Sequence, residues 1–122
     1  MREASFILPL DVKWQESWSA HQWVKDQLLT TFGGYTATHK SGAWRDPDTG
    51  QGYKDQSVDY VVAYETGNML TAEAHMEQLR LIAHTAGKQR GQLAMYIKDF
   101  NGEVSIERVV RHEKTNIGSL TP

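Results

Sequence analysis

The chain contains no cysteine and only three prolines. Without thiols it can form no disulfide, thiolate metal site or cysteine nucleophile, and this favours a reducing compartment. No apolar run approaches the roughly 20 residues that span a bilayer. The N-terminus also lacks the apolar stretch of a secretory signal peptide. We therefore expect a cytoplasmic protein with no membrane partner.

A strong excess of charge is also missing. The 13 basic residues nearly balance the 15 acidic ones, which gives a net charge of −2 and an isoelectric point near 6.2. Nucleic-acid-binding proteins need a basic surface, so no nucleic-acid partner is expected. A chain of 122 residues that is 39% hydrophobic forms one domain with an ordinary core. We expect this domain to span residues 1–111, followed by a flexible tail over 112–122.

Familiar catalytic motifs are missing as well. There is no HExxH pair, and His75 and His84 are nine residues apart, which places them on opposite sides of a helix. No nucleophile elbow surrounds Ser41 or Ser57. We therefore expect no metal site, no cofactor and no covalent enzyme intermediate.

The hydrophobic pattern predicts a first strand, a helix and a pair of strands. The first strand covers Ser5–Val12, and Pro9 inside it indicates an edge position or a bulge. The helix covers Ala20–Phe32, is capped by Ser19 and ends at Gly33 and Gly34. Two strands then follow, Tyr35–Trp44 and Tyr53–Tyr64, joined by a turn at Pro47–Gly50.

The remaining chain predicts a second helix and a hairpin. Thr71 caps a helix that runs to Ala86 and ends at Gly87. Leu93–Lys98 and Val104–Val110 are paired across a type I′ turn at Asn101–Gly102.

This element order predicts an α+β fold of the ferredoxin-like split βαβ type. We expect an antiparallel sheet with two helices on one face and an extended β-hairpin. The other face would expose Tyr, Val and Met side chains, which a monomer tolerates poorly, so an oligomer is expected.

The functional hypothesis rests on the central hairpin. Asp55 follows Trp44 by eleven residues with a turn between them, so chain reversal brings the two together. An indole beside a carboxylate is a good receptor for an organic cation. Asp46 and Asp48 are interpreted as turn residues, and Asp59 as a solvent-facing strand residue. The alternative reading, an exposed aromatic over a turn, remains open at this point.

Four short motifs together resemble the small phage-encoded S-adenosylmethionine-cleaving enzymes, the SAM lyases once called SAM hydrolases. They also resemble uncharacterised small bacterial and phage proteins with a G-x-W-R-D hairpin. The likeness covers roughly residues 5–110. In the lyases, the positions of Trp44 and Asp55 are usually tyrosine and glutamate. The motifs are Gly34-Tyr35-Thr36, Ser41-Gly42-Ala43-Trp44-Arg45-Asp46, Lys54-Asp55-x-Ser57-Val58 and Gly91-Gln92-Leu93-Ala94-Met95-Tyr96.

The resemblance implies a cytoplasmic homotrimer, connected with resistance to host restriction, that binds S-adenosylmethionine between subunits. It implies that Trp44 and Asp55 act on the ligand. Residues implied to line the pocket are Tyr35, Tyr53, Lys54, Gln56, Ser57 and Gln92. Two other functions remain open: a non-catalytic protein that sequesters a nucleotide or metabolite, and an interaction protein whose hairpin binds a partner.

Overall fold

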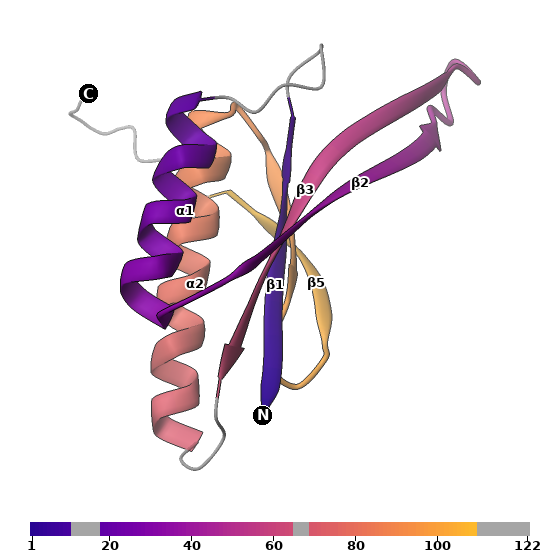
Figure 1. Ribbon diagram of the computed structural model, residues 1–122. Helices are drawn as coiled ribbons and strands as arrows, with labels where there is room; N and C mark the ends of the chain where they lie inside the picture. Colours follow the sequence, from indigo (N-terminus) through magenta and orange to yellow (C-terminus); the bar gives the residue numbers. More distant parts are fainter. Residues whose placement is uncertain (11–17, 65–68, 110–122) are drawn as a thin grey trace, which may run out of the picture.

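A computed structural model describes residues 1–10, 18–64 and 69–109 (Figure 1). The predicted tail and most of the predicted loop over Lys13–Ser19 lie outside these residues. The fold is α+β, and each predicted helix and strand is present. The elements are β1 (Arg2–Pro9), α1 (Trp18–Phe32), β2 (Thr36–Arg45), β3 (Gly52–Tyr64), α2 (Met69–Gln89), β4 (Ala94–Lys98) and β5 (Val104–Arg108).

The strands form one antiparallel sheet in the order β2-β3-β1-β4-β5. Both helices lie on the same face of this sheet (Figure 1). The opposite face has no covering element within the described residues. Tyr96 and Val104, which are 42% and 47% exposed, and the half-buried Val61 lie on this open face. The methionine prediction was wrong, because Met95 has the opposite strand parity and is buried under the helices.

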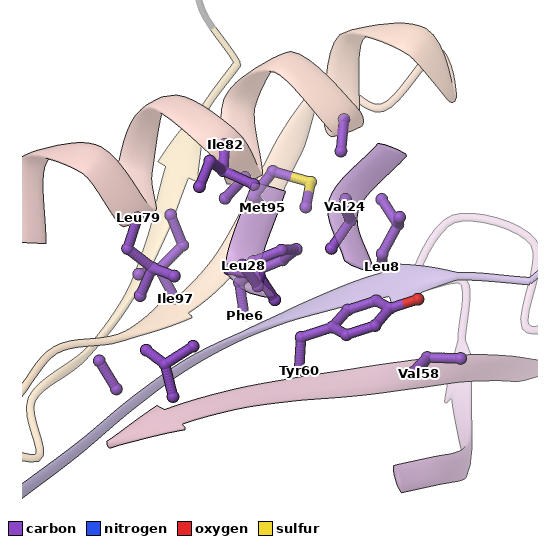
Figure 2. Close-up of a cluster of buried hydrophobic side chains, with 14 of the residues drawn as sticks. Phe6, Leu8, Val24, Leu28, Val58, Tyr60, Leu79, Ile82, Met95 and Ile97 are labelled. Atoms are coloured by element: carbon purple, nitrogen blue, oxygen red, sulfur yellow. The ribbon is translucent and has the colours of Figure 1, made fainter. Parts of the chain in front are cut away.

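The core lies between the helices and the inner sheet face (Figure 2). Alternation along β3 places Val58, Tyr60 and Val62 in it, and none of these is more than 1% exposed. Each helix adds an apolar stripe at helical spacing. The largest fully buried side chains are Tyr60, Phe6, Leu8, Leu28, Leu79, Met95, Ile97, His21, Val24, Val58 and Val62.

Strand β1 is central, so the edge position predicted from Pro9 was wrong. β1 pairs with β3 along its whole length and with β4 at Ser5 and Phe6. Pro9 is the last strand residue, and the next amide, Leu10 N–H, donates to the Gln56 carbonyl of β3 at 2.9 Å. The nitrogen of Pro9 therefore points away from β3, beyond the pairs with β4, and the ladder loses no hydrogen bond.

The predicted ends of the helices were only partly right. Gly33 follows α1 with a φ of 79°, which a residue with a Cβ rarely adopts. Ser19 and Thr71 are not caps, because α1 begins at Trp18 and α2 begins at Met69. Helix α2 continues through Gly87, and Gly91 (φ 70°) follows its end.

The end of α2 has the hydrogen bonds of a Schellman motif. The N–H of Gln92 donates to the Gly87 carbonyl at 2.8 Å, and that of Gly91 donates to the Lys88 carbonyl at 3.0 Å. Gly87 therefore has a different role from the predicted one. A Cβ on it would lie 2.6 Å from Met95 Sδ and 3.2 Å from Val109 Cγ2, so its small size lets α2 approach the sheet.

The β4–β5 connection is a hairpin, but not with the predicted two-residue type I′ turn. Gly102 N–H donates to the Asp99 carbonyl at 3.0 Å, and Asp99 N–H donates to the Glu103 carbonyl at 2.9 Å. This pattern is a turn centred on Phe100 and Asn101 with a left-handed Gly102, a three-residue hairpin loop. Burial of Phe100, which is 7% exposed, favours the longer loop.

We predict that Gly87→Val lowers the free energy of unfolding by roughly 1–3 kcal/mol, because the added methyl groups overpack the core. Urea denaturation monitored by tryptophan fluorescence measures this change. Gly34→Val is the matched control, since no atom lies within 4 Å of its added Cβ and its φ is not positive. An equal effect of the two substitutions would contradict the packing role of Gly87.

Candidate functional site

The central hairpin extends beyond the rest of the sheet (Figure 1). Strand β1 pairs only with residues Ser57–Tyr64 of β3, and Leu10 after it bonds to Gln56, so residues 52–55 of β3 pair with β2 alone. We call residues 41–56 the arm. The arm is a two-stranded ribbon, and its described side chains are largely exposed. It therefore contributes little to the core.

Unbroken pairing of β2 with β3 decides which residues share a face. Trp44 pairs with Tyr53, and Gly42 pairs with Asp55. Because strand side chains alternate, positions 42, 44, 53 and 55 have the same parity as the open face of the sheet. The register thus supports the prediction that chain reversal brings positions 44 and 55 to one wall. The side chain of Trp44 lies outside the described part of the structure.

A run of polar residues continues from the arm onto the open sheet face. We call it the polar strip, and it consists of Lys40, Tyr53, Asp55, Ser57 and Asp59. Lys40 Nζ lies 3.0 Å from Asp59 Oδ2. The prediction that Asp59 faces solvent was wrong, because its side chain is only 13% exposed. Sequence reasoning also missed Lys40, although the alternation of β2 places it on the same face.

Asp55 differs from Asp59 in having no counter-ion. Within the described residues, its exposed carboxylate makes no hydrogen bond or ion pair. Directly opposite, a Cβ added to Gly42 would meet no atom within 4 Å. An unpaired carboxylate therefore borders open space on the polar strip, and this arrangement suits a cationic ligand.

The turn of the arm is held by its own polar groups, as predicted. Asp46 Oδ1 accepts from Asp48 N–H at 2.8 Å, and Gly50 N–H donates to the Asp46 carbonyl at 2.8 Å. Thr49 Oγ1 accepts from Gln51 N–H at 3.2 Å. Asp46 thus fixes the turn and is not an open ligand group.

Four of the predicted pocket residues lie away from the polar strip in a single chain. Lys54 and Gln56 have the opposite parity on the arm. Gln92 follows α2, and its Nε2 reaches only the Arg90 carbonyl at 3.5 Å. Tyr35 precedes β2 and packs on Tyr60 with ring centroids 6.2 Å apart.

Strand β2 separates Tyr35 from Trp44. This strand has 10 residues, which extend over roughly 30 Å. A pocket lined by both residues would need two chains.

A second polar cluster lies between α2 and β5. Glu107 accepts from Arg80 Nε and from His84 Nε2, both at 2.9 Å, and from Ser105 Oγ at 3.1 Å. Burial raises the pKa of Glu107, but the hydrogen bonds from His84, Arg80 and Ser105 and the charge of Arg80 outweigh it. The pKa of Glu107 is therefore below its usual value. This cluster attaches the edge strand to the helix.

The other histidines near the core have packing roles, as expected. His21 is fully buried, with Nδ1 2.6 Å from the Tyr60 hydroxyl and Nε2 3.0 Å from the Pro9 carbonyl. A carbonyl only accepts, so Nε2 carries a proton. His75 packs on Tyr64 with ring centroids 4.5 Å apart.

Residues 1–10, 18–64 and 69–109 contain no group of three His, Asp or Glu side chains that could hold a metal ion. No helix among them combines the length and the apolar character that crossing a bilayer requires. A shallow, open depression lies at the end of the sheet away from the arm, and its lining includes Arg2, Glu3 and Lys98.

Comparison of the fold with solved structures finds phage SAM lyases. One, in complex with S-methyl-5′-thioadenosine, has a TM-score of 0.59 and 14% identity, over 89% of this chain and 88% of that chain. Another, in the apo state, has a TM-score of 0.58 and 16% identity, over 93% and 91%. The chain has the fold of these phage SAM lyases. The resemblance seen in the sequence is thereby confirmed for the fold, while no family model and no curated protein matches the sequence.

The Glu107 cluster predicts a pH-dependent contribution to stability. A carboxylate whose pKa is lowered on folding stabilises the fold above its unfolded pKa, near 4.5, and this stabilisation is lost as the pH falls through the folded value. We expect Glu107→Gln to cost about 1 kcal/mol at pH 7, since the cluster is partly exposed. The loss should shrink at pH 3 in urea titrations.

The exposed Glu103 in the neighbouring turn serves as the control, and Glu103→Gln should change little at either pH. The same penalty for Glu107→Gln at both pH values would show that its charge is not what stabilises the cluster.

Proposed function

We propose that this protein is a SAM lyase that converts S-adenosylmethionine into methylthioadenosine and homoserine lactone. One observation carries the proposal: the fold is shared over 89% of the chain with a phage SAM lyase that was solved with S-methyl-5′-thioadenosine. The cation-binding geometry of the polar strip gives independent support, because S-adenosylmethionine carries a sulfonium and an ammonium group.

The proposed reaction needs only the substrate's own atoms. The carboxylate oxygen attacks the γ-carbon and forms the lactone C–O bond, while the C–S bond breaks and its electron pair stays on sulfur. No proton is gained or lost. Since the carboxylate and sulfonium charges both fade toward the transition state, a partly desolvated pocket that holds the substrate folded would accelerate the step.

Roles for the site residues follow from this chemistry. Asp55 holds the cationic part of the ligand, and Trp44 lines the adenosine or sulfonium position. Tyr53 and Ser57, on the same face, shape the pocket next to Asp55. In the proposed pocket, Lys54, Gln56, Tyr35 and Gln92 approach the ligand from other copies of the chain, because the length of β2 keeps one copy from supplying both Tyr35 and the arm residues.

The same proposal includes a homotrimer with the ferredoxin-like fold and pockets between subunits. The β-α-β-β-α-β order and the central position of β1 support this fold. The open sheet face supports self-association, since Ile106 and Val104 are 76% and 47% exposed on it. In a phage-infected cell such an enzyme would act in the host cytoplasm and deplete the methyl donor that restriction systems use.

The second candidate is a protein that binds the ligand without cleaving it. It is favoured by Asp55 and Trp44, which replace the glutamate and tyrosine usual in the lyases. Aspartate is one methylene shorter, and tryptophan has no hydroxyl to donate a hydrogen bond. After both replacements, a carboxylate and an aromatic face remain to bind a cation.

Incubation of the purified protein with S-adenosylmethionine tests these alternatives. Chromatographic detection of methylthioadenosine and homoserine lactone in proportion to enzyme would support the lyase. Retention of unchanged S-adenosylmethionine on gel filtration would favour the binding protein. The absence of both product and binding would reject the two proposals and leave the interaction protein.

We predict that Asp55→Asn lowers kcat/KM, or ligand affinity, by at least tenfold, which is about 1.4 kcal/mol, because the variant loses the charge opposite the ligand cation. Asp48→Asn removes the same charge from the exposed turn of the arm and should retain wild-type activity. Equal activity of the two variants would remove Asp55 from the site.

We predict that Trp44→Ala weakens ligand binding but leaves the thermal midpoint nearly unchanged, because the arm lies outside the core. Differential scanning fluorimetry and ligand titration measure the two effects. A large fall in the midpoint would instead give position 44 a structural role.

A further inference from the structure

We infer that Lys40, held in place by Asp59, binds the carboxylate of the ligand, so that the polar strip selects ligands with an intact zwitterionic amino-acid group. This inference rests on the proposed function and deepens it. Asp55 receives the cationic part of the ligand. Lys40 receives the carboxylate through the oxygen that does not attack, which leaves the other oxygen available to form the lactone bond.

The register places Lys40 between the two acids of the strip. Lys40 pairs with Ser57, and Asp55 and Asp59 are the residues two positions before and after Ser57. Such diagonal neighbours on one face lie about 7–8 Å apart, within reach of a lysine side chain. The structure shows Lys40 paired with Asp59 at 3.0 Å, and this pairing leaves Asp55 available.

The ion pair between Lys40 and Asp59 contributes little to the stability of the fold, which indicates that it has another role. Asp59 Oδ1 is buried and has no hydrogen-bond partner, although Oδ2 holds the lysine. A buried acceptor without a donor lowers the stability of the fold. Lys40 itself is 51% exposed, so solvent weakens its attraction to Asp59. The arrangement fixes an exposed ammonium group beside the site at an energetic cost.

The surface next to Lys40 is open. Gly42 is two residues further along β2 on the same face, and a Cβ there would meet no atom within 4 Å. A ligand in this space would have the Asp55 carboxylate across from it and the Lys40 ammonium at one end. Lys40 and Asp55 carry opposite charges, as do the carboxylate and ammonium groups of a zwitterion, while Asp59 holds the lysine in place.

Two neutral thioethers distinguish recognition of the amino-acid group by Lys40 from recognition of the adenosine. S-adenosylhomocysteine and methylthioadenosine share the adenosine and the sulfur, but only the first has the amino-acid group. Isothermal titration of the full chain should show that Lys40→Met weakens the binding of S-adenosylhomocysteine at least tenfold, which is about 1.4 kcal/mol. The affinity for methylthioadenosine should change less than twofold. Lys40→Arg should keep most of the affinity, and the exposed Lys88→Met is the matched control.

Asp59→Asn gives a second test if Lys40→Met lowers the thermal midpoint. Without Asp59, Lys40 is free to pair with Asp55, so S-adenosylhomocysteine affinity should fall while methylthioadenosine affinity is retained. Equal losses for both ligands, or no loss for S-adenosylhomocysteine, would overturn the role of Lys40. A wild-type chain that binds methylthioadenosine but not S-adenosylhomocysteine would also overturn it while leaving the proposed adenosine site. A wild-type chain that binds neither thioether but cleaves S-adenosylmethionine would overturn this inference alone. One that neither binds the thioethers nor binds or cleaves S-adenosylmethionine would overturn the proposed function as well.

Discussion

The unbroken ladder between β2 and β3 is the constraint on which the candidate site depends. All 10 residues of β2 have a partner in β3. Strand side chains alternate strictly, so a single slip or bulge would exchange the two faces of the arm. The burial of Val58 and Tyr60 under the helices fixes which positions of β3 face the core. Because the pairing is continuous, the same alternation extends into the arm and places Asp55, Tyr53 and Lys40 on one face.

Much of the fold was predictable from the sequence, because hydrophobic periodicity reports directly on burial. The apolar residues that alternate in β3 and those that recur at helical spacing in α1, such as Val58 and Val24, are buried. Predictions based on single residues were less reliable. Pro9 fits a central strand because its missing N–H lies where no ladder bond is needed, and Gly87 marks close packing, not a helix end. Local propensity cannot distinguish these cases, since tertiary contacts decide them.

The site was predictable only in part. The placement of positions 44 and 55 on one face follows from a turn between two strands, and the structure has that turn. The distance of Tyr35 from the arm could not be foreseen from motifs, because a motif lists residues without saying which face or which end of a strand they occupy. The Lys40–Asp59 pair was missed for a related reason: it depends on a diagonal relation across two strands, which becomes visible only when the register is known.

The separation of the arm from the core has a consequence for the history of such proteins. A ribbon whose residues pair almost entirely with each other can exchange its side chains without disturbing the buried sheet, so sequence drift there is tolerated. Exchanges in the arm can then alter its exposed surface while the scaffold stays intact. The scaffold itself tolerates wide sequence change, since two chains with 14% identity share this fold over most of their length.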